Sequence, residues 1–163
     1  MTTTPEQASR NSTQIEALKD VPAIRITRDF DAPVERVFRA WVEKDLFERW
    51  IGPRSHPVSI EHWDARTGGS WRYSIGGDDV AARFYGSFHE VRPNQRLVQT
   101  FTWEGAPDGV SLETMTFTDL GDGRTRTVGL SVVESFQIRD MIMASGMETG
   151  VIEGYEKLDE LLA

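Results

Sequence analysis

Two polar side chains, Glu113 and Gln99, occupy stretches in which polar and apolar residues alternate. Such alternation is typical of a β-strand with one buried face, and it places Glu113 beside Met115 and Gln99 beside Phe101. A carboxyl group that faces an apolar interior is costly without a partner, and a raised pKa there would suit general acid–base catalysis. We consider three explanations for Glu113: an ion pair with an arginine such as Arg83, a position at the solvent-filled mouth of a pocket, or a one-residue difference in register.

The same alternation predicts which other side chains face the interior. Any one aromatic ring is explained by ordinary core packing, but a few polar groups among many apolar ones are typical of small-molecule pockets. The predicted inner face carries, strand by strand, Trp71, Tyr73 and Ile75; Phe84, Gly86 and Phe88; Leu97, Gln99, Phe101 and Trp103; Glu113, Met115 and Phe117; and Val128, Leu130 and Val132. The ligand-binding residues we expect on the sheet are Trp71, Tyr73, Phe84, Phe88, Gln99, Phe101, Trp103, Glu113 and Met115.

Other catalytic arrangements find little support. The histidines, His56, His62 and His89, do not have the spacing of a metal site, and no metal is expected. No serine lies in a Gly-x-Ser-x-Gly motif, and no glycine pair is followed by the Lys-Ser or Lys-Thr of a phosphate-binding loop. Asp64 and Arg66 lie two apart on one face of a strand, and we interpret them as a structural ion pair or a turn anchor.

The elements that would position these residues follow from periodicity and turn signals. Strands are predicted over 23–30, 58–66, 70–75, 81–91, 96–103, 111–120 and 124–134, separated by Gly-, Asn-, Asp- and Pro-containing turns. Two short helices follow the first strand, the first beginning at Asp31-Ala32-Pro33 and the second covering 44–50. Because consecutive antiparallel strands usually pair, we expect an α+β fold in which a curved antiparallel seven-stranded sheet wraps around a long C-terminal helix.

That helix is predicted over 138–163, the longest stretch with helical periodicity. Gly146, Gly150 and Gly154 recur every four residues and would leave a groove without side chains. The groove either packs closely against a neighbouring element or leaves room for a bound molecule. Met143 and Met147 adapt to irregular shapes and suit either interpretation. We add Met143, Met147 and Gly150 to the expected ligand-binding residues.

Composition limits the classes of partner. The net charge of −8 argues against nucleic acid and anionic membranes, and no apolar run is long enough to span a membrane. The chain has no cysteine and begins without a secretory signal, so we expect a cytoplasmic protein. Residues 1–20 are predicted to be a disordered polar tail and 21–163 a single domain.

Several segments resemble one known family. They are FDAPVERVFRAWVE (30–43), FERWIGP (47–53), DARTGGSWRY (64–73), the C-terminal RDMIMASGMETGVIEGYEKLDELLA and, less strongly, GSFHEVRPNQRLV (86–98). They resemble the START-like (SRPBCC) superfamily and, within it, proteins similar to the C-terminal domain of the activator of heat-shock protein 90 ATPase. The resemblance implies a helix-grip (START/Bet v-like) fold with a deep cavity between sheet and last helix, no metal and no fixed cofactor. It supplies no shared catalytic motif, so no catalytic residue is carried over.

Three functions remain open. We favour binding of a small hydrophobic or aromatic molecule between the sheet and the C-terminal helix. The first alternative is a polyketide cyclase- or dehydratase-like enzyme that uses Glu113 as acid or base, with Tyr73 or His62 as its partner. The second is a protein-interaction module that contacts a chaperone. A homodimer is compatible with all three.

Overall fold

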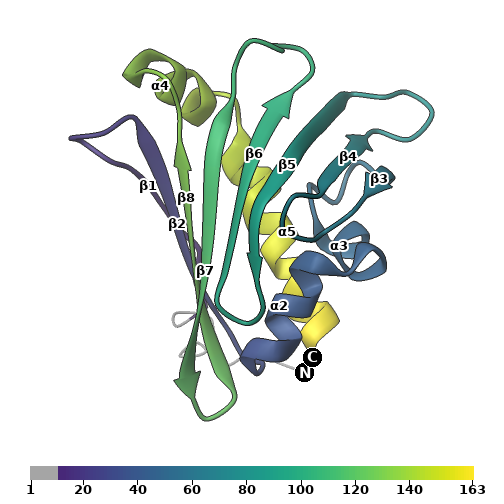
Figure 1. Ribbon diagram of the computed structural model, residues 1–163, viewed down its shortest axis with the longest axis vertical. Coiled ribbons are helices and arrows are strands. Elements are labelled where there is room, and N and C mark those ends of the chain that lie inside the picture. Colours follow the sequence, from purple (N-terminus) through teal and green to yellow (C-terminus); the bar gives the residue numbers. More distant parts are fainter. Residues whose placement is uncertain (1–10) are drawn as a thin grey trace.

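The computed structural model describes residues 11–163 of the chain. The elements, in chain order, are β1 (Gln14–Ala17), β2 (Ala23–Phe30), α2 (Val34–Val42), α3 (Lys44–Trp50), β3 (Val58–Trp63), β4 (Ser70–Ile75), β5 (Ala82–Arg92), β6 (Arg96–Trp103), β7 (Ser111–Gly121), β8 (Arg124–Val132), α4 (Phe136–Ala144) and α5 (Met147–Leu162) (Figure 1).

The strands form one antiparallel sheet in the order β1-β2-β8-β7-β6-β5-β4-β3. Strands β3 to β8 pair with their neighbours in sequence, whereas β2 lies beside the last strand, β8. Helices α2 and α3 therefore carry the chain from one side of the sheet to β3 at the far edge. The sheet is curved, and α5 runs along one of its faces, which we call the inner face (Figure 1).

Aromatic side chains fill one end of the space between the inner face and the helices. The ring centroids of Phe30 on β2 and Tyr155 on α5 are 5.4 Å apart, and Trp41 on α2 lies 5.3 Å from Phe117 on β7. The guanidinium of Arg28, which is buried, binds Asp159 of α5 through two hydrogen bonds. These contacts fix α5 on the sheet through its later turns.

Two elements differ from those predicted. The sheet has eight strands rather than seven because residues 14–17, which we assigned to the disordered tail, pair with β2 as an edge strand. Residues 1–10 of that tail lie outside the described residues. The expected C-terminal helix is divided into α4 and α5 at Gly146, whose φ of 85° is left-handed and interrupts the helical backbone.

Candidate functional site

The residues that share the inner face follow from the strand register, because directly opposite residues of paired strands point to the same side. Gln99 of β6 lies opposite Glu113 of β7, which lies opposite Ser131 of β8. These three form a polar row across the middle of the sheet, which continues to Phe88 on β5 and Ile24 on β2. The polar row therefore runs through an otherwise apolar surface.

Glu113 is the only member of the polar row that can carry a charge. It is half-buried, so part of its surface still touches open space. Burial raises its pKa to about 7, and a hydrogen bond with the Ser131 hydroxyl opposes that rise. Arg83, the arginine that we considered as a partner, instead forms an ion pair with Glu61 at 3.7 Å. Of our three explanations, the structure supports a carboxyl group that faces an accessible space in the predicted register.

An aromatic wall borders the polar row on strands β4 to β6. Trp71 and Tyr73 are stacked with an interplanar angle of 21° and ring centroids 5.2 Å apart. Phe101 lies 5.6 Å from Trp71, and Phe84 lies 5.1 Å from Phe101. We call these four residues the aromatic wall. Trp71 and Tyr73 are buried, whereas Phe84 and Phe101 keep part of their surface accessible.

Two tyrosine hydroxyls also face this interior. Tyr73 on the sheet and Tyr155 on α5 are each 5% exposed. Among residues 11–163, neither hydroxyl has a hydrogen-bond partner, and neither oxygen is completely enclosed. Burial raises the pKa of both, and for Tyr155 the charge of Arg28 opposes that rise. The Glu113 carboxylate raises the pKa of each further, so both lie within electrostatic reach of Glu113. By contrast His62, the other proposed partner of Glu113, lies opposite Arg72 and is hydrogen-bonded to Ser70 on the outer face.

Helix α5 forms the helical side of the interior, and its Val151 is half-buried and packs against the aromatic core. Met143 on α4 and Met147 at the start of α5 are also half-buried, and their place in the ligand site stays a prediction. Gly150 does not face the sheet interior as we expected, because a Cβ at this position would lie 3.8 Å from Pro53. A Cβ at Gly154 would lie 3.1 Å from the Trp50 carbonyl oxygen. Gly154 therefore allows α5 to pack closely against the end of α3, which is the first of the two interpretations, whereas the distance at Gly150 is an ordinary contact.

Strand β8 shows where the prediction of the inner face was wrong. Val128, Leu130 and Val132 lie opposite Thr116, Thr114 and Leu112, on the outer face. The inner residues of β8 are instead Thr125, Thr127, Gly129 and Ser131. The buried hydroxyls of Thr125 and Thr127 donate to the carbonyls of Ala32 and Arg28. Ser131 was therefore not among the predicted inner residues, because the apolar residues of β8 are on the side away from α5.

The remaining predicted residues divide between core and rim. Phe88 is buried in the core, and Met115 is half-buried on the inner face beside Gly129. Trp103 shares its face with Phe84, its partner across the strands, but it lies at the end of β6 and is 49% exposed. Asp64 and Arg66 form the expected ion pair at 3.0 Å.

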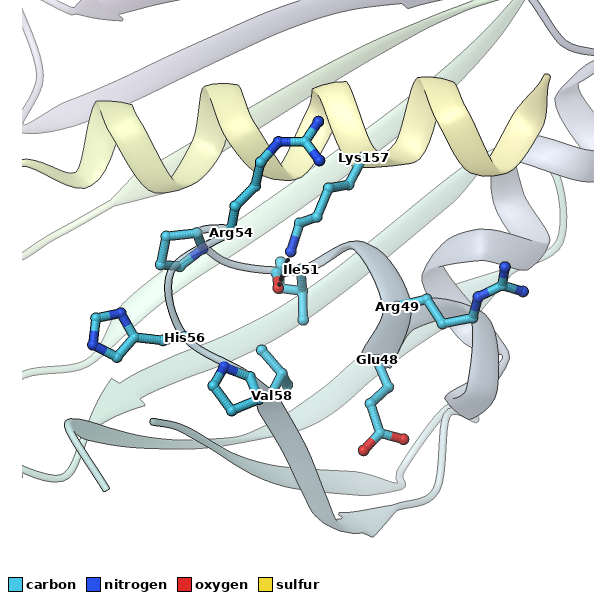
Figure 2. Close-up of a pocket in the computed structure, with 9 residues that line it drawn as sticks. Glu48, Arg49, Ile51, Arg54, His56, Val58 and Lys157 are labelled. Carbon is cyan, nitrogen blue, oxygen red and sulfur yellow. Dashed lines mark hydrogen bonds between the residues drawn. The ribbon is translucent and has the colours of Figure 1, made fainter. Parts of the chain in front are cut away.

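A separate cavity, of about 460 Å³, lies outside this interior between the α3–β3 connection and α5 (Figure 2). Lys157 donates to the Ile51 carbonyl at 3.3 Å, and Arg54 binds Glu160 at 2.6 Å. Glu48 accepts a hydrogen bond from the Ile60 amide. These three polar groups are engaged with the protein itself and fasten the connection to α5, whereas Arg49, which also lines the cavity, has no hydrogen bond or ion pair within residues 11–163. We take the interior as the candidate site because the polar row and the aromatic wall meet there.

The described part of the chain shows neither a metal cluster nor a membrane-spanning helix. Within residues 11–163, no three His, Asp or Glu side chains are grouped so that they could hold a metal ion. In the same residues, no helix is long and apolar enough to cross a membrane.

A curved antiparallel sheet that grips a C-terminal helix, with a polar row beneath that helix, defines a helix-grip protein of the START-like class. The family model described as "Activator of Hsp90 ATPase homolog 1-like protein" matches residues 31–163. The chain belongs to this family. A search of curated proteins found no match.

Solved structures show the same fold. Protein Ms6760 from Mycobacterium smegmatis is 25% identical, with a TM-score of 0.84 and coverage of 93% of this chain and 98% of the other. A protein from Arthrobacter aurescens is 29% identical, with a TM-score of 0.82 and coverage of 91% and 90%. CalU16 from Micromonospora echinospora is 20% identical, with a TM-score of 0.59 and coverage of 94% and 85%, and shows the fold alone.

Proposed function

We propose that the protein binds a small, predominantly aromatic molecule between the inner face of the sheet and α5. One observation carries the proposal: the polar row of Gln99, Glu113 and Ser131 keeps accessible surface although it lies on the face that α5 covers. An interior that served only as core would be expected to be apolar at these positions, because buried polar groups without partners are costly. A few polar groups beside an aromatic wall are typical of ligand sites.

A thermal-shift screen with aromatic polyketides, flavonoids, fatty acids and sterols tests the proposal. A ligand present at about 100 times its Kd adds about 2.7 kcal/mol to the free energy of unfolding. For a chain of this length, that corresponds to a rise of about 5–10 °C in Tm. We expect a rise with aromatic compounds.

Two matched variants locate the site. Ser131→Phe places a large side chain on the inner face of β8, and Leu130→Phe places the same side chain on the outer face of that strand. We expect Ser131→Phe to abolish the rise in Tm and Leu130→Phe to retain it. Equal responses of the two variants, with both folded, would contradict binding in the interior.

An acid–base enzyme of the cyclase or dehydratase type is the second candidate. It is favoured by the position of Glu113, which faces the interior beside two tyrosines and has a pKa of about 7, near the pH at which proton transfer is efficient. Compounds that bind would be incubated with wild type and Glu113→Gln, and products followed by mass spectrometry. Turnover that Glu113→Gln abolishes would support the enzyme, and turnover that persists unchanged would remove Glu113 from the mechanism.

A further inference from the structure

One buried donor of the aromatic wall has no partner. Trp71 is 3% exposed, yet its indole Nε1 makes no hydrogen bond within residues 11–163. Leaving such a donor unpaired costs about 1–3 kcal/mol, so buried indole N–H groups usually have partners. Two other tryptophans show the usual arrangement: Trp63 donates to the Val42 carbonyl and Trp50 to the Ala40 carbonyl, each at 2.8 Å.

The surroundings of Trp71 place this donor on the inner face. Trp71 lies opposite Gly86 on β5, and a Cβ at Gly86 would lie 2.8 Å from indole Cε2, the atom bonded to Nε1. The absence of a side chain at Gly86 is therefore what allows the indole to rest on the sheet. Gly86 is two residues before Phe88, whose partner is Gln99. Trp71 and Gly86 thus form the pair of opposite residues next to the polar row, on the same face of the sheet.

The charges around the interior restrict the ligand further. Arg28, a buried cation of the inner face, has its charge paired with Asp159, although its Nε has no hydrogen-bond partner among residues 11–163. The polar row carries the acidic Glu113 and no cation. A carboxylate ligand would therefore be repelled by Glu113 above neutral pH and would find no free cation there. The rings of the aromatic wall, by contrast, provide faces on which a planar molecule can stack.

We propose that the interior binds a neutral planar aromatic carbonyl compound, an aryl ketone or quinone, whose oxygen accepts a hydrogen bond from the Trp71 indole N–H while its rings lie against the aromatic wall. This inference rests on the proposed function and specifies its ligand class. The acceptor oxygen supplies the partner that Trp71 lacks among residues 11–163. Because Nε1 has no accessible surface in this structure, the neighbouring rings must move aside to admit that oxygen.

Two probes with the same skeleton test the role of the oxygen. 9-Fluorenone and fluorene share three fused rings. At the same position, 9-fluorenone has a carbonyl group and fluorene has a methylene group. Because one hydrogen bond to a buried donor contributes about 0.5–1.5 kcal/mol net, we expect wild type to bind 9-fluorenone about three- to tenfold more tightly than fluorene. In Trp71→Phe, which keeps a ring and removes the donor, this preference should fall to about one. Trp63→Phe is the matched control and should keep it, since the Trp63 donor is already engaged.

A second measurement does not depend on the folding of a variant. In ¹⁵N-tryptophan-labelled wild type, we expect the Trp71 indole N–H resonance to move on addition of 9-fluorenone and to respond differently to fluorene. If fluorene binds in a manner blocked by Ser131→Phe but 9-fluorenone binds no more tightly, the assignment of Trp71 is wrong while the proposed function stands. If neither probe binds wild type, this inference is overturned, and the proposed function falls with it only when the thermal-shift screen shows no rise in Tm for any aromatic compound.

Discussion

Replacing Glu113 with Gln is expected to change how stability depends on pH. The ordinary pKa of a glutamate is 4.5, and burial raises that of Glu113 to about 7 in the folded state. Below pH 4.5 the carboxyl is protonated in both states and contributes no pH dependence. Between the two values the unfolded chain ionises while the folded one stays neutral, so wild type loses stability as pH rises.

The magnitude follows from the two pKa values. At about 1.4 kcal/mol per pKa unit, the difference corresponds to about 3 kcal/mol, reached above pH 7. The amide introduced by Glu113→Gln does not titrate, so the free energy of unfolding of this variant relative to wild type should increase by about this amount between pH 4.5 and 8. For a chain of 163 residues, the relative Tm would change by about 6–12 °C.

Urea denaturation of both proteins at intervals from pH 4.5 to 8 measures this difference. The control is Glu156→Gln, which removes an exposed carboxylate from α5. Comparing each variant with wild type at every pH removes constant effects of the amide. A difference between Glu113→Gln and wild type that stays flat across this range, as for the control, would refute the argument that partial burial raises the pKa of Glu113.

Two further predictions concern the frame around the site. Gly86→Ala would place a Cβ 2.0 Å from the Thr100 carbonyl oxygen and 2.7 Å from the Trp71 ring. We expect a loss of about 2 kcal/mol in the free energy of unfolding, measured by urea denaturation, and an unchanged value would contradict these close contacts. Asp159→Asn leaves the buried Arg28 without its carboxylate partner. Because the Asp159 side chain is 37% exposed, we expect only a moderate loss, about 2 kcal/mol in the free energy of unfolding, by the same assay. No loss would show that the ion pair does not hold α5 on the sheet.

The sequence was informative where side-chain alternation and burial agree. On strands β4 to β7 the aromatic residues and Glu113 lie on the predicted face, because large apolar residues alternate there with exposed polar ones. On β8 the pattern misled, since the inner face needs small residues and hydroxyls such as Thr127 and Ser131. The apolar residues of β8, such as Leu130, lie outside.

Other features depend on contacts that a linear pattern does not contain. Strand β1 has the polar sequence QIEA and is held by backbone pairing with β2, so it has no apolar alternation to reveal it. The break at Gly146 depends on one left-handed backbone conformation, which a helix-compatible pattern conceals. The unpaired donor of Trp71 becomes visible only when strands β4, β5 and β6 are placed side by side.

The most direct test of an interior ligand site is the response of the methionine methyl groups. Met115 lies on the inner face of the sheet, whereas Met141 on α4 is 65% exposed. In protein labelled with ¹³C at the methionine methyls, titration with the aromatic compound that raises Tm most in the screen should shift the Met115 resonance saturably and leave Met141 nearly unchanged. A saturable shift of Met141 with Met115 unmoved, or no saturable shift at all, would contradict binding between the sheet and α5.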